Sequence, residues 1–96
     1  MSVTSAAQRV VVHGRVQGVG YRDAAVQAAF DAGVKGWVRN RRDGTVEAFV
    51  QGEPDAVRRF VDWCKRGPPL ARVSAVEATD AGVDATLRDF SCRSTE

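Results

Sequence analysis

The sequence predicts an α+β fold in which an antiparallel sheet of four to five strands carries two helices on one face. Short segments alternate apolar and polar residues as strands do, and two longer segments place apolar residues at helical spacing. Glycine, proline or an Asp-Gly pair marks the boundaries between them. The order is strand, helix, strand, strand, helix, strand, with one extra strand. This order is the split βαβ arrangement, also called ferredoxin-like.

Composition indicates a single small domain. The chain has 96 residues, 44% hydrophobic and 27% charged, and we expect one domain at 8–96 behind a flexible N-terminus at 1–7. The net charge of +2 is too small to predict a nucleic-acid partner, and the apolar runs are too short to span a membrane. Residues 1–7 do not resemble an export signal, so we expect a cytoplasmic protein. Nothing in the sequence suggests an obligate dimer, and we expect a monomer.

The first strand is predicted at residues 8–16. Val10 and Val12 point to one face of the sheet, and Val11 and His13 point to the other. His13 is a candidate general base, but no carboxylate or nucleophile accompanies it at matching spacing. We therefore favour a strand histidine on the less buried face.

The first helix is predicted at residues 22–32. Val26, Ala29, Phe30 and Gly33 fall at i, i+3, i+4 and i+7, which predicts a stripe facing the core. Gly33 can adopt a positive φ and end the helix.

A β-hairpin is predicted next, with strands at 34–40 and 45–51. Asp43-Gly44 between them is a strong hairpin signal. The second strand of the hairpin alternates as a half-buried strand does, with one face formed by Val46, Ala48 and Val50.

The second helix is predicted to begin at Pro54, since proline fits the first helical position. Its core stripe is the clearest in the chain and consists of Val57, Phe60, Val61 and Cys64. The segment Lys65-Arg66-Gly67 ends the helix, and Pro68-Pro69 forbid its continuation.

The remaining residues predict a strand at 72–79, a loop at 80–86 and a short last strand at 87–93. Phe90 and Cys92 share one face of this last strand. We expect Cys64 and Cys92 to be reduced. A disulfide between them remains an alternative if the second helix packs on the last strand.

Residues 14–23 connect the first strand to the first helix through glycines at 14, 18 and 20. Such a loop exposes backbone N–H groups at a helix N-terminus, where the partial positive charge favours an anion. Arg22 adds a planar fork of donors that matches two phosphate oxygens. The segment is therefore a candidate phosphate or carboxylate cradle, although these residues alone equally fit a tight turn that binds nothing.

The glycine spacing excludes two well-known nucleotide loops. No Gly-Lys-Ser/Thr follows the glycines, so the segment is not a nucleotide P-loop. Gly18 and Gly20 supply the first two glycines of a dinucleotide fingerprint, but Asp23 stands where the third is required.

Residues 12–22, Val-His-Gly-Arg-Val-Gln-Gly-Val-Gly-Tyr-Arg, resemble the first signature of the acylphosphatase family. A second family signature appears at 36–40, Gly-Trp-Val-Arg-Asn, and continues at the expected spacing with Gly44, Val46 and Gly52. The resemblance extends through 67–69 and 72–73 to Phe90 and so covers nearly the whole chain.

Two residues depart from the family pattern. Tyr21 stands where the family usually has Phe or Met, and Cys92 stands where an aliphatic residue is more usual. We expect Tyr21 to change the packing beside the loop and not the chemistry.

The resemblance implies the same fold and a hydrolase that cleaves acyl phosphates to a carboxylate and inorganic phosphate. It implies that Arg22 binds the phosphoryl group and that Asn40 positions the attacking water. The phosphate-binding loop corresponds to Gln17, Gly18, Val19, Gly20 and Tyr21, which act chiefly through their backbone amides. The partners are then a small acyl phosphate as substrate and inorganic phosphate as product.

The residues themselves are consistent with this chemistry. The chain has no Ser–His–acid set, no cysteine with a histidine nearby in sequence, and no carboxylate cluster for a metal. We therefore expect direct attack by water, with no metal and no cofactor. An acyl phosphate suits this mechanism, because its carboxylate leaves without strong acid assistance, and catalysis then needs mainly positioning and charge stabilisation.

The residues alone leave the role of Asn40 open. Its side-chain amide can orient water, or it can simply cap the hairpin, and only the family resemblance decides between the two. The neighbouring Arg39, Arg41 and Arg42 can raise the local positive potential, although a solvated face is the simpler interpretation.

Two alternatives involve binding without catalysis. RNA-recognition domains share this element order but stack bases on aromatic residues of the two central strands. Here the first strand has no aromatic residue and the third has only Phe49, which argues against RNA. The other alternative is a regulatory module that binds an acyl- or carbamoyl-phosphate metabolite.

Overall fold

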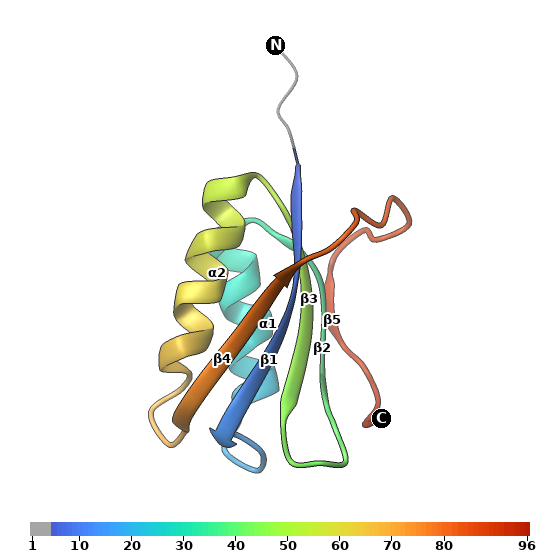
Figure 1. The fold of residues 1–96 in the computed structure, drawn as a ribbon. Coiled ribbons are helices and arrows are strands. Elements are labelled where there is room, and N and C mark those ends of the chain that lie inside the picture. Colours follow the sequence, from blue (N-terminus) through green and yellow to red (C-terminus); the bar gives the residue numbers. More distant parts are fainter. Residues whose placement is uncertain (1–4) are drawn as a thin grey trace.

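The structure, a computed structural model, describes residues 5–96. A five-stranded sheet forms one layer, and two helices pack on one of its faces (Figure 1). In chain order the elements are β1 (Ala6–Arg15), α1 (Tyr21–Ala32), β2 (Lys35–Asn40), β3 (Val46–Gly52), α2 (Pro54–Arg66), β4 (Arg72–Asp80) and β5 (Phe90–Cys92). The strand order β4-β1-β3-β2-β5 confirms the predicted ferredoxin-like architecture.

The antiparallel prediction holds for four strands and is wrong for the fifth. β1 pairs antiparallel with β3 and β4, and β2 pairs antiparallel with β3, but β5 pairs in parallel with β2. The cause is the path of the chain. β4 ends opposite Gln8, at the end of the sheet where β2 begins, so a strand that enters the sheet there runs in the direction of β2.

The expected flexible N-terminus at 1–7 is too long. Ala6 and Ala7 belong to β1, because β3 extends far enough to pair them with Gly52 and Gln51. Residues 1–4 lie outside the described residues. The last strand is shorter than the predicted 87–93 and spans only Phe90–Cys92.

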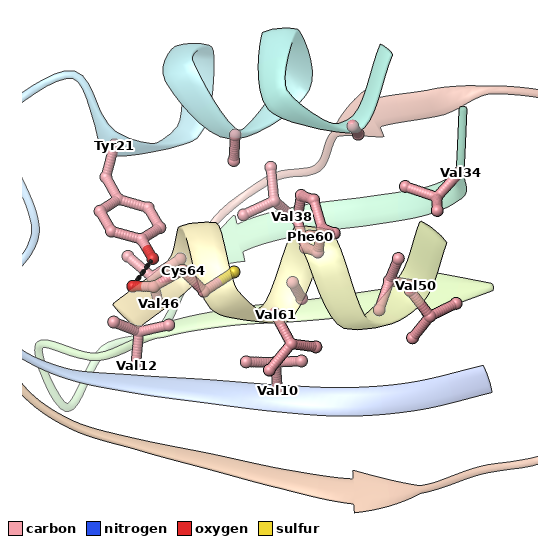
Figure 2. Close-up of a cluster of buried hydrophobic side chains, with 14 of the residues drawn as sticks. Val10, Val12, Tyr21, Val34, Val38, Val46, Val50, Phe60, Val61 and Cys64 are labelled. Atoms are coloured by element: carbon pink, nitrogen blue, oxygen red, sulfur yellow. Dashed lines mark hydrogen bonds between the residues drawn. The ribbon is translucent and has the colours of Figure 1, made fainter. Parts of the chain in front are cut away.

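The core lies between the sheet and the helices. Figure 2 shows valine side chains of the sheet and residues of α2 meeting there, among them Val10, Val12, Val38, Val46, Val50, Phe60, Val61 and Cys64. The predicted stripe of α2 is confirmed, because all four of its residues are buried.

The predicted stripe of α1 is only partly correct. Ala29 is buried as predicted and Val26 packs against the core, whereas Phe30 is 80% exposed. Tyr21 explains the difference, since its ring is 2% exposed and sets the rotation of the helix. Tyr21, Ala25 and Ala29 then form an i, i+4, i+8 stripe, and Phe30 lies one residue, about 100°, around the helix from it.

The two cysteines do not form a disulfide. Cys64 is buried and Cys92 is exposed, and both are free thiols. Burial raises the pKa of the Cys64 thiol to about 12. Among residues 5–96, no helix has the length and apolar character that crossing a membrane requires.

Candidate active site

Three connections lie at one end of the sheet. They are the β1–α1 loop at 16–20, the β2–β3 hairpin turn at 41–45, and the α2–β4 connection at 67–71 (Figure 1). The two family-like signatures therefore meet in space, although 17 residues lie between Arg22 and Asn40 in the sequence.

The β1–α1 loop has the backbone geometry of an anion cradle. Gly18 and Gly20 have φ values of 72° and 78°, in the left-handed region that glycine adopts without strain. Left-handed residues within a turn direct successive N–H groups to one side, which forms an anion-binding concavity. α1 begins at Tyr21, and no side chain from the described residues caps it at Gly20. Its first-turn amides are therefore available to an anion.

A small cavity of about 100 Å³ joins this loop to β2. It is lined by Val16, Gly18, Gly20, Tyr21, Arg22, Asp23 and Asn40. The volume is far below the roughly 300–1,000 Å³ of pockets for drug-sized ligands, so the cavity suits a phosphoryl-sized group and not a nucleotide. In the described chain, the guanidinium of Arg22 forms no ion pair or side-chain hydrogen bond, so it remains available to a ligand.

Asn40 reaches the cavity because of its position in the sheet. It is the last residue of β2 and pairs with Val46, whose side chain is buried on the helix-covered face. Alternation along the strand places Asn40 on the same face as Val38, toward the helices. No hydrogen bond from another residue in 5–96 occupies its side-chain amide.

Gln17 connects the loop to the hairpin. Its side-chain Nε2 donates hydrogen bonds to the carbonyl oxygens of Arg41, at 2.7 Å, and Thr45, at 2.9 Å. Thr45 is itself held by Asp43, whose carboxylate accepts from both its N–H and its hydroxyl. These two Gln17 hydrogen bonds, called the tie below, fix the cradle relative to the end of β2, where Asn40 lies.

The Tyr21 side chain is part of the core. Its hydroxyl donates a 2.7 Å hydrogen bond to the carbonyl oxygen of Cys64 (Figure 2). The usual helical donor for that carbonyl is the N–H of residue 68, which is a proline and has none. Tyr21 therefore satisfies a buried carbonyl that the end of α2 leaves open. Burial raises the pKa of Tyr21 well above its usual value, so the hydroxyl stays protonated.

The cavity brings together five of the predicted site residues: Gly18, Gly20, Tyr21, Arg22 and Asn40. Gln17 and Val19 belong to the same loop but do not line the cavity. Sequence reasoning missed Val16 and Asp23 as lining residues. Asp23 is exposed in the first turn of α1, where the helix dipole favours a carboxylate.

The other candidate residues lie elsewhere. His13 contacts the carboxylate of Glu77 on β4 at 2.9 Å and does not line the cavity. Arg39 binds Glu47, which is only 2% exposed and also binds Arg9. Burial alone would raise the pKa of Glu47, but hydrogen bonds from Arg39 and Arg9 outweigh it and leave that pKa lowered. Arg39 therefore neutralises a buried carboxylate and is not a free positive charge.

Comparisons with known proteins identify the family of the chain. The family model for acylphosphatase matches residues 8–92. An acylphosphatase from Nocardioides sp. is 54% identical over 84 residues, which are 88% of this chain and 84% of the relative. One from Bordetella avium is 54% identical over 69 residues, which are 72% of this chain and 73% of the relative.

A solved structure supports the same conclusion. The structure of an acylphosphatase from Coxiella burnetii matches with a TM-score of 0.88 at 35% identity, covering 93% of each chain. The fold, the two signatures and these relatives agree, and the chain belongs to the acylphosphatase family.

Proposed function

We propose that this chain, by family a hydrolase of acyl phosphates, cleaves the carboxyl–phosphate bond by direct attack of water on phosphorus. The cavity that joins an uncapped helix N-terminus, the guanidinium of Arg22 and the amide of Asn40 is the observation that carries the proposal. Cavity size and charge suit a phosphoryl group there.

In the proposed step, the oxygen of water bonds to phosphorus while the bond from phosphorus to the carboxylate oxygen breaks. The carboxylate leaves with the electron pair, and since carboxylic acids have pKa values near 4, it needs no proton to leave. Negative charge spreads over the three other phosphoryl oxygens in the transition state. The loop amides and Arg22 meet that charge from fixed positions, which is the most effective form of electrostatic stabilisation.

Asn40 acts on the water. Its side-chain oxygen accepts a hydrogen bond from the water, which directs a lone pair of the water toward phosphorus. The hydroxyl of Tyr21 is engaged with Cys64, which leaves Asp23 as the lining carboxylate that a covalent mechanism would use. An Asp23→Asn variant that keeps its rate would exclude an aspartyl-phosphate intermediate at this position.

Arg22→Ala tests the cradle. Phosphate release from acetyl phosphate should fall by about 10²-fold to 10³-fold, the usual cost of one donor to transition-state charge. Arg88→Ala, which removes an exposed arginine from the loop between β4 and β5, is the matched control and should keep its rate. Circular dichroism confirms folding of both, and an unchanged rate in Arg22→Ala would reject the proposal.

Asn40→Ala tests whether Asn40 orients the attacking water. A group that orients the nucleophile acts on the chemical step, so kcat should fall far more than KM rises. A change confined to KM would make Asn40 a substrate-binding residue and would contradict the mechanism.

The finer expectations complete the proposal. The chain acts as a monomer in the cytoplasm, without nucleic acid, metal or cofactor. Size-exclusion chromatography with light scattering measures the oligomeric state, and a hydrolysis assay with and without chelator measures the metal requirement. Loss of activity on chelation, or tight phosphate-analogue binding without turnover, would contradict the proposed reaction.

A further inference from the structure

A second cavity adjoins the first. It has a volume of about 260 Å³ and is lined by Arg15, Gly18, Val19, Pro69, Leu70 and Arg72. Gly18 lines both cavities, so the two adjoin at this residue. A glycine there places no side chain between them.

The second cavity contains two arginines in an unusual arrangement. Arg15 and Arg72 are directly opposite each other in the pairing of β1 with β4, and both are exposed. Like charges directly opposite each other in a sheet are destabilising. Within residues 5–96, neither guanidinium forms an ion pair that would offset this repulsion.

A β-bulge creates this pairing. The register of β1 and β4 shifts between His13 and Gly14, so that Arg72 lies opposite Arg15. Gly14, at φ 122°, permits the close approach of the strands, because a Cβ there would lie 2.1 Å from the carbonyl oxygen of Arg72. Bulges next to functional sites commonly redirect a side chain.

The remaining lining suits a short carbon chain. Leu70 is 74% exposed, and Val19 lines the same cavity. The cavity therefore offers apolar surface beside the cradle and two uncompensated positive charges.

We propose that this second cavity binds the acyl group of the substrate and selects acyl phosphates whose acyl group carries its own anion, a carboxylate or a phosphate. The inference rests on the proposed function. With the phosphoryl group in the small cavity, the acyl chain passes Gly18, and its distal anion lies between Arg15 and Arg72. Planar guanidinium groups match the oxygens of either anion.

The test compares two substrates, acetyl phosphate, whose acyl group is neutral, and succinyl phosphate, whose acyl group ends in a carboxylate. The kcat/KM ratio of succinyl to acetyl phosphate is measured for the unaltered chain, Arg15→Gln, Arg72→Gln and the double variant. Arg88→Gln is the control, since it also removes one positive charge and Arg88 lines neither cavity.

In the double variant the ratio should fall about threefold to tenfold, the range expected when exposed ion pairs are lost. Hydrolysis of acetyl phosphate should stay within about twofold, and added salt should lower the ratio of the unaltered chain toward that of the double variant. Thermal unfolding should show no loss of stability, because the substitution also relieves the repulsion between the arginines.

If kcat/KM changes for neither substrate in the double variant, the inference is overturned. It is also overturned if kcat/KM falls equally for both substrates, because the ratio is then unchanged and the arginines attract anions in general without forming a subsite. If the unaltered chain hydrolyses neither substrate, the proposed function itself fails, and this result is distinct from the other two.

Discussion

Gln17→Ala is the most informative single substitution, because it removes the hydrogen bonds between the β1–α1 loop and the hairpin without removing any phosphate-binding group of the cradle. The variant loses both hydrogen bonds from Nε2, at 2.7 Å to Arg41 and 2.9 Å to Thr45. It leaves the backbone amides of the loop and the guanidinium of Arg22 in the chain.

The structure sets the magnitude. A neutral hydrogen bond contributes about 0.5–1.5 kcal/mol net, so two give about 1–3 kcal/mol. Both acceptors keep another donor, since Arg41 N–H donates to the Thr45 carbonyl and Gly44 N–H donates to the Arg41 carbonyl. No carbonyl is left unpaired, so the free energy of unfolding should fall by about 1 kcal/mol, the lower end of that range.

The effect on activity should be larger than the effect on stability. Without the tie, the loop and Asn40 are no longer held in one geometry, and a displacement of about 1 Å can cost a factor near 10² in rate. We expect kcat for acetyl phosphate to fall about tenfold to a hundredfold, with a smaller change in KM. Urea unfolding and initial-rate kinetics measure the two effects.

Two further variants make the test specific. Gln17→Met keeps the length of the side chain without its donors and should behave as Gln17→Ala does. Gln8→Ala removes an exposed 3.2 Å hydrogen bond to Asp80 near the far end of β1 and should change neither quantity. If Gln17→Ala matched Gln8→Ala in kcat, the tie would have no part in catalysis.

Three other predictions concern the core. Tyr21→Phe leaves the Cys64 carbonyl without a donor and should lower the free energy of unfolding by about 1–3 kcal/mol; denaturant titration measures it, and no loss would contradict the pairing. Because the pKa of Cys64 is raised from 9.0 to about 12, the thiol stabilises the fold below pH 9. Stability should fall by up to about 1.4 kcal/mol per pH unit between pH 9 and about pH 12, and Cys64→Ala should reduce that slope in alkaline unfolding experiments. Parallel slopes in the two proteins would contradict the prediction. Phe30→Ala, at an exposed site, should change stability by under about 0.5 kcal/mol, whereas Phe60→Ala should cost about 3–5 kcal/mol; comparable losses would mean that α1 is rotated otherwise.

The sequence predicted the elements and their order because their signals are local. The stripe of α2, the Asp-Gly turn and the alternation of the hairpin strands depend on residues a few positions apart. The rotation of α1 was not predictable in this way. Alanines give a weak pattern, and the buried ring of Tyr21, which decides the rotation, lies at the first residue of the helix and bonds to Cys64, 43 positions away.

The site shows the same division. Glycines at 18 and 20 and the arginine at 22 indicated an anion cradle, because turn geometry and helix ends follow from neighbouring residues. The cavity that joins Arg22 to Asn40 depends on sheet pairing, and the pairing of Arg15 with Arg72 depends on a bulge. Those contacts join residues far apart in sequence, and no spacing rule predicts them.

The loop and Arg22 are proposed to bind a phosphoryl group beside Asn40, and titration of the ¹⁵N-labelled chain with inorganic phosphate is the decisive measurement. We expect the largest chemical-shift changes on the backbone amides of residues 18–22 and the side-chain amide of Asn40. We also expect Arg22→Ala to weaken the fitted affinity for phosphate. Shifts centred on other residues, or the same affinity in the variant, would contradict the proposal.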